Sequence, residues 1–119
     1  MSPRSPDART RALAERRPGD PTPLDRVVNF GPVTLPEFAA IGITTVDQIE
    51  RLGAEETCRR YVERFPERLN VNALVGVVAT LEGVPWTKVS PGGKALARRI
   101  VDDLAAEFGP ARAAKRPPR

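Results

Sequence analysis

The sequence predicts an all-α protein, a single small domain of five helices with a disordered basic tail at each end. Apolar residues recur at helical spacing in three segments of the second half, and no core segment alternates apolar and polar residues as a strand would. Nine of the thirteen prolines lie before or after the core helices. We therefore expect residues 1–23 to be a disordered Pro/Arg-rich tail, residues 24–109 to fold, and residues 110–119 to form a disordered basic tail.

The first two helices are expected in the stretch from Asn29 to Gly53, joined by a glycine turn. Gly42 follows an apolar run and suits the left-handed conformation that closes a helix, and Ile43 supplies the usual apolar contact. Thr45 and Gln48 have the spacing of a capping box, so they begin a second helix that Gly53 ends. A tight helix–turn–helix connection of this kind is typical of a helix-hairpin-helix unit.

A further hairpin is indicated just before this pair, at residues 29–32. Gly31 would make the turn, and Pro32 has the fixed backbone angle that suits the first turn of a helix. The two short helices joined at Gly42 would form the helix-hairpin-helix-like N-terminal pair of the domain.

Three more helices are expected after Gly53. Residues 54–65 carry one apolar stripe with i, i+3, i+4 and i+7 spacing, formed by Cys58, Tyr61, Val62 and Phe65. Asn70 can cap the next helix, which runs to about Glu82 with almost no polar side and must therefore be central. The last helix opens at Ser90 and Pro91 and ends at Gly109 and Pro110, with an apolar face of Leu96, Ile100, Leu104 and Phe108.

Two positions near the central helix carry packing predictions. Gly76 costs about 1 kcal/mol relative to alanine, which close approach of a neighbouring helix would offset. Trp86 is expected to cover the core as a lid, because a single tryptophan buries a large area in a small domain. A ligand-stacking role for Trp86 is the alternative.

Several short motifs of this region resemble a known family. They are Asn29–Thr34, Ile41–Val46, Leu52–Ala54, Asn70–Leu74, Leu81–Gly83 and Trp86. Their order and spacing are similar to the C-terminal domain of the TfoX/Sxy competence regulators, over roughly residues 26–104, without either tail or the N-terminal domain of full-length members. The resemblance implies a non-enzymatic regulatory module of bacteria, linked to competence or transcription regulation, that acts by binding another regulatory protein.

Direct, weak and non-specific DNA binding is the alternative function. The net charge is +4, but residues 1–20 and 109–119 hold the basic excess and leave the remainder slightly acidic. Phosphate contacts of the C-terminal tail would come from four residues, Arg112, Lys115, Arg116 and Arg119.

The hairpins offer a second route to DNA, since helix-hairpin-helix units can point turn amides at a phosphate. The residues that could make such contacts are Asn29, Gly31, Thr34, Gly42, Thr44 and Thr45. The DNA-binding pattern is incomplete, because Pro32 has no N–H and Val33 stands where a basic residue would help. The competing interpretation is that both glycines only make tight helix turns.

Enzymatic and metal chemistry have little support in the sequence. With no histidine and one cysteine, a zinc site or an internal disulfide is not expected, and Cys58 lies on an apolar helix face as a structural thiol. We expect no catalytic, cofactor-binding or metal-binding residues. We also expect no membrane segment or signal peptide, and a cytoplasmic location, since no apolar stretch is long enough to span a bilayer.

Overall fold

The structure, a computed structural model, describes the backbone of residues 5–115 and the side chains of residues 8–109. The five α-helices are α1 (Ser5–Glu15), α2 (Thr34–Ala40), α3 (Val46–Arg64), α4 (Val71–Glu82) and α5 (Pro91–Lys115). Three single-turn helices connect them: η1 (Leu24–Arg26), η2 (Pro66–Arg68) and η3 (Trp86–Lys88). No strand occurs between residues 5 and 115, so the all-α prediction is confirmed for that part of the chain.

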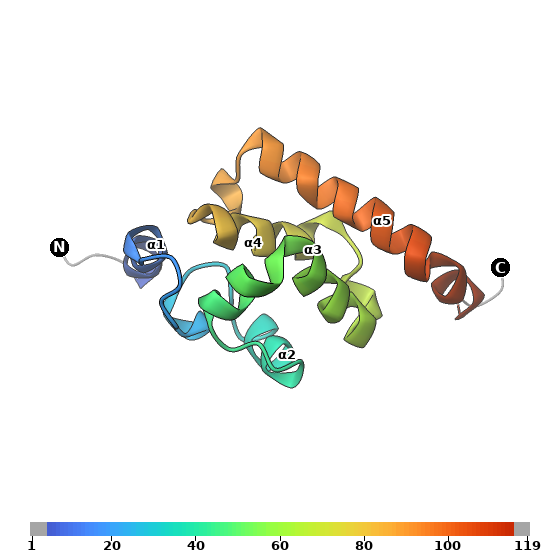
Figure 1. Ribbon diagram of the computed structural model, residues 1–119, viewed down its shortest axis with the longest axis horizontal. Coiled ribbons are helices and arrows are strands. Elements are labelled where there is room, and N and C mark those ends of the chain that lie inside the picture. The colour runs from blue at the N-terminus through green and yellow to red at the C-terminus, as the bar shows by residue number, and fades with distance from the viewer. Residues whose placement is uncertain (1–4, 116–119) are drawn as a thin grey trace.

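Helix α4 is the central element, as its apolar composition predicts. It packs against both α3 and α5, and α2 lies on the far side of α3 from α5 (Figure 1). Its side chains Leu74, Val77 and Val78 are buried, and the Asn70 side chain caps it by accepting a hydrogen bond from the Ala73 N–H at 2.8 Å. The predicted start of this helix is therefore confirmed.

The turn between α2 and α3 also follows the sequence. Gly42 has φ +80°, the left-handed conformation that favours glycine, and the N–H groups of Gly42 and Ile43 bond back to the carbonyls of Ala39 and Phe38. These two bonds are the Schellman pattern that satisfies the last carbonyls of a helix. Ile43 is only 2% exposed and anchors the turn in the core.

Gly53 divides α3 into two helical segments. Its φ of +85° and ψ of 166° are non-helical, so residues 46–52 and 54–64 lie on either side of a kink. The sequence prediction of two helices meeting at Gly53 is thus correct in substance. The described residues form five α-helices, but these are not the five that the sequence predicts. Helix α1 was not expected, and the two segments on either side of Gly53 form the single helix α3.

Helix α1 differs from the expected disordered tail. Leu13 is 2% exposed, and the Arg16 side chain makes two hydrogen bonds to Glu50, at 2.7 and 3.1 Å. Arg9 donates to the Phe30 carbonyl at 2.8 Å. The apolar stems of the two arginines lie along the core while their guanidinium groups bind oxygen atoms. This face of α1 therefore packs on the core although Leu13 is its only large apolar residue.

Helix α5 runs past its predicted end at Gly109 and Pro110. The helical backbone continues to Lys115, so residues 110–115 are not the irregular tail that we expected. Proline removes one backbone donor, but the alanines at 111, 113 and 114 have the highest helix propensity. Figure 1 shows these last turns projecting from the rest of the molecule.

Two packing predictions in the second half are wrong. Trp86 is 53% exposed and does not cover the core. A Cβ at Gly76 would meet only the Asn29 carbonyl oxygen at 3.8 Å, an ordinary contact, so no helix approaches there. The close approach lies instead at Gly93, where a Cβ would fall 2.3 Å from the Glu82 carboxylate and 2.8 Å from a Val89 methyl group.

Candidate functional site

The hairpin between α2 and α3 is the candidate site, and most of its backbone donors are used within the chain. The Gly42 N–H donates to the Ala39 carbonyl at 3.0 Å. The N–H groups of Thr44 and Thr45 both donate to Gln48 Oε1, at 2.7 and 3.1 Å. Gln48 thus supplies its half of the predicted capping box and occupies the amides that a phosphate would need.

The backbone groups of the earlier segment around Gly31 also make their hydrogen bonds within the chain. The Gly31 N–H donates to Thr34 Oγ1 at 2.9 Å, and its carbonyl accepts from Leu35 N at 2.9 Å. The element directly before this segment is the single turn of η1, and α2 begins at Thr34 rather than Pro32. The segment is therefore a cap for α2 and lacks a helix of its own on the N-terminal side.

Asn29 has a bonding role that the sequence did not indicate. Its Nδ2 donates to the Val84 carbonyl at 3.0 Å and to Thr80 Oγ1 at 3.2 Å, while its Oδ1 accepts from the Trp86 N–H at 2.8 Å. Its φ of +90° is a conformation that non-glycine residues seldom adopt. Asn29 joins the segment before α2 to the turn after α4, so its side chain is committed inside the fold.

The N-terminal segment covers one edge of the hairpin. Leu24 N donates to the Thr44 carbonyl at 3.0 Å, and Val46 N donates to the Thr22 carbonyl at 2.8 Å. These bonds form an isolated antiparallel bridge between Pro23 and Thr45. Segment 22–24 therefore lies against backbone that would otherwise be open to a ligand.

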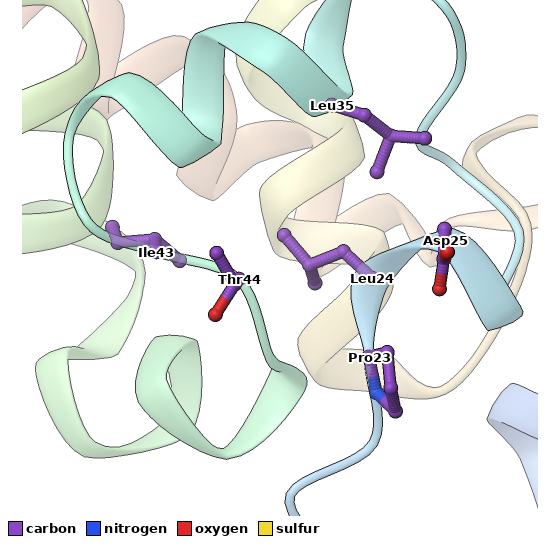
Figure 2. Close-up of a pocket in the computed structure, with 6 residues that line it drawn as sticks. All are labelled: Pro23, Leu24, Asp25, Leu35, Ile43 and Thr44. Carbon is purple, nitrogen blue, oxygen red and sulfur yellow. The ribbon is translucent and has the colours of Figure 1, made fainter.

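A pocket of about 330 Å³ opens beside the hairpin. Its lining comes from three places in the chain, as Figure 2 shows: η1 and the residue before it, α2, and the turn into α3. The lining residues are Pro23, Leu24, Asp25, Leu35, Ile43 and Thr44. Asp25 is the only charged member, so the hairpin presents an apolar hollow with an acidic rim.

A polar cluster of Glu37, Tyr61 and Arg68 ties α2 to α3 and η2. The Tyr61 hydroxyl donates to Glu37 Oε1 at 2.5 Å, and Arg68 Nη2 donates to Glu37 Oε2 at 2.7 Å. The Arg68 hydrogen bond holds the pKa of Glu37 below its usual range, although partial burial opposes it. Burial, followed by the bond to Glu37, raises the pKa of Tyr61. The cluster fixes the position of α2, and no local sequence signal could have found it.

Cys58 is buried, as its place on an apolar stripe predicted. It has no exposed surface, and burial, with a smaller effect of the Glu55 charge, raises the pKa of its thiol to about 12. Over the described residues, no group of three or more metal-ligating side chains occurs, and no helix combines the length and apolar character needed to cross a bilayer.

The basic residues of the C-terminal tail fall outside the described side chains. Arg112 and Lys115 lie on the backbone of α5, while Arg116 and Arg119 come after the last described residue. Their predicted phosphate contacts therefore stay predictions.

Comparisons with protein families, curated proteins and solved structures find no match to this chain. The resemblance to TfoX C-terminal domains rests on the order and spacing of the short motifs.

Proposed function

We propose that this chain is a non-enzymatic regulatory module that binds another protein through the hairpin between α2 and α3. The observation that carries the proposal is the apolar pocket of about 330 Å³ beside amides that are already hydrogen-bonded. The helix-hairpin-helix character of this pair and the resemblance to TfoX C-terminal domains support a role in competence or transcription regulation.

The pocket suits an apolar side chain of a protein better than a phosphate or a small polar ligand. Its volume is at the lower limit of small-molecule sites, which span about 300–1,000 Å³ and converge several polar groups on their ligand. Here Asp25 would repel a phosphate, and the Thr44 carbonyl already accepts a bond from Leu24. Apolar anchors seated in such pockets dominate the affinity of many protein interfaces.

Site-specific photo-crosslinking tests this proposal. A benzophenone amino acid replaces Thr44, which is exposed at the pocket rim, and Asp102, an exposed position on α5, serves as the matched control. In extracts of the source cell, we expect one protein to be captured from position 44 and not from position 102. Leu35→Glu, which places a charge on the pocket wall, should remove that capture while the helical circular dichroism stays unchanged.

DNA binding is measured on the same full-length chain. We expect duplex affinity of about 10⁻⁴ to 10⁻⁶ M at physiological salt, supplied by the C-terminal tail. Each lost phosphate contact lowers the dependence of log affinity on log salt concentration by roughly 0.9. Replacing Arg112, Lys115, Arg116 and Arg119 by glutamine should therefore nearly abolish this salt dependence. Capture of nucleic acid alone at position 44, with affinity kept after these replacements, would overturn the protein-binding proposal.

A further inference from the structure

Trp86 lies exposed beside a second pocket, whose lining shares no residue with the first. The pocket measures about 240 Å³ and lies among η3, the first turns of α4 and the start of α5. Its lining consists of Val71, Asn72, Val75, Trp86, Thr87 and Lys94. Val71 and Val75 are one helical turn apart on α4, so they form an apolar wall next to the indole ring.

The backbone holds Trp86 in place although the side chain is 53% exposed. Asn29 Oδ1 accepts from the Trp86 N–H at 2.8 Å, and Asn29 Nδ2 binds the Val84 carbonyl two residues earlier at 3.0 Å. The η3 turn is closed by Lys88 N donating to the Pro85 carbonyl at 2.8 Å. A partner would therefore meet a large aromatic surface on a preorganised backbone, which reduces the entropic cost of binding.

The charge around this pocket is positive. Lys94 lines it, Lys88 follows Trp86 in η3, and Arg98 lies one turn beyond Lys94 on α5. Within the described side chains, these three make no ion pair, whereas six arginines elsewhere do: Arg16, Arg51, Arg59, Arg60, Arg68 and Arg99.

Among the described side chains, the two carboxylates nearest in sequence make no ion pair with these three residues and do not line the pocket. Glu82, at the end of α4, accepts hydrogen bonds from the Ser90 N–H and hydroxyl at 2.9 and 2.6 Å. Asp102 lies a further turn along α5 from Arg98. No carboxylate lines the pocket.

We propose that this surface docks an acidic segment of a partner protein, with one apolar side chain of that segment seated between Trp86 and the two valines. The inference rests on the proposed protein-binding function and names the chemistry of a partner. The pocket is smaller than the roughly 300 Å³ at which small-molecule sites begin, so it suits a single side chain. The chain's own C-terminal tail is basic and is not a complementary occupant.

A single-stranded nucleic acid is the other negatively charged ligand that an exposed tryptophan and lysines could bind. Such sites stack successive bases on several aromatic rings along a basic groove. The chain has one tryptophan, one tyrosine and four phenylalanines. Tyr61, Phe30 and Phe38 are buried, and Trp86 is the only aromatic residue that lines this pocket. The aliphatic wall of Val71 and Val75 gives a second base no ring to stack on, so an acidic protein segment is favoured.

Selection of peptides on the full-length chain tests the proposal. A phage-displayed library of random peptides supplies the probes, and selected sequences without tryptophan are synthesised and titrated while the fluorescence of Trp86, the only tryptophan, is recorded. We expect the selected peptides to be net acidic with a fixed apolar residue, and to shift the Trp86 emission to the blue as the ring is buried.

Variants at exposed positions show whether the named residues carry the binding. Trp86→Ala should weaken binding about thirtyfold, as loss of a central aromatic anchor does, measured by calorimetry since the fluorophore is lost. Lys94→Glu should weaken it about tenfold. Arg11→Glu makes the same charge change at an exposed position on α1, and Val33→Ala trims another large apolar residue that is exposed. Both should leave affinity unchanged.

Three outcomes would overturn this inference: selected peptides that are not acidic, peptide affinity that is insensitive to Trp86→Ala, or a Trp86 response to oligothymidylate and to no peptide. The crosslinking from position 44 fails or succeeds separately, because Thr44 lines a different pocket. A captured protein at position 44 with no Trp86-dependent peptide would remove only the present inference. Trp86-dependent acidic peptides without capture at position 44 would remove the role of the hairpin.

Discussion

Cys58 has a buried thiol whose reactivity should report on unfolding. It has no exposed surface, and its pKa is raised to about 12, so almost no thiolate exists at neutral pH. We expect a disulfide reagent such as dithionitrobenzoate to leave the native chain unmodified and to modify one thiol per chain in denaturant. Rapid modification of the native chain, at the rate of a free small thiol, would show that this region of α3 opens readily.

Glu37 should contribute to the acid sensitivity of the fold. Its pKa is lowered in the folded state, chiefly by the Arg68 hydrogen bond, so its contribution to stability is present above the unfolded-state pKa of about 4.3. That contribution is lost as the pH falls through the folded-state pKa. Glu37→Gln should therefore lower stability at neutral pH and flatten its decline below about pH 4.5, measured by urea unfolding across a pH series.

Glu15→Gln is the matched control for this pH series. Glu15 is exposed and has no ion-pair partner among the described side chains. Its replacement should leave the pH profile of the free energy of unfolding unchanged. A profile for Glu37→Gln identical to that of the parent chain would contradict the assigned role of the Glu37, Tyr61 and Arg68 cluster.

At the scale of elements, Gly93 and Gly92 give a matched pair at the start of α5. Alanine normally stabilises a helix by about 1 kcal/mol over glycine. At Gly93 the new Cβ would meet Glu82 and Val89 at 2.3 and 2.8 Å, so Gly93→Ala should be destabilising in thermal unfolding. At Gly92 the nearest atom is 3.9 Å away, so Gly92→Ala should stabilise or be neutral. Equal effects of the two substitutions would refute the tight packing of α5 on Glu82.

The ends of most helices could be predicted because the residues that set them are neighbours in sequence. Asn70 caps α4, and Gly42 and Gly83 take left-handed conformations where the apolar runs end. The exposure of Trp86 could not be predicted in this way. The backbone position of Trp86 is fixed by a contact distant in sequence, since its N–H donates to the side chain of Asn29, 57 residues earlier.

At the scale of the whole molecule, the position of the hairpin could be predicted from neighbouring residues, but the contacts of its backbone with distant segments could not. Thr45, Gln48 and Gly42 marked the turn correctly. The Thr44 carbonyl and the Val46 N–H are covered by segment 22–24, although composition placed residues 22 and 23 in a disordered tail. The Glu37, Tyr61 and Arg68 cluster was missed for a similar reason, since its bonds join residues 24 and 31 positions apart.

Composition alone does not predict helix α1, because the apolar stem of arginine can be buried although its guanidinium is charged. Arg16 is long enough to lie along the core, and its side chain is only 8% exposed where it meets Glu50. The Arg16 hydrogen bond is also the largest cause of the lowered pKa of Glu50. An apolar count of residues 7–17 finds one large side chain, whereas the folded face also includes the stems of Arg9 and Arg16.

The docking of α1 leads to a prediction that separates it from a disordered tail. Leu13 is 2% exposed, so Leu13→Ala leaves a cavity and should cost about 2–5 kcal/mol, the range for a buried leucine. Arg11→Ala, at an exposed position on the same helix, should change the free energy of unfolding by less than about 0.5 kcal/mol. Urea unfolding of both variants measures the difference. Equal stability of the two would mean that α1 contributes nothing to the core, and the N-terminal segment would then be free to leave the hairpin.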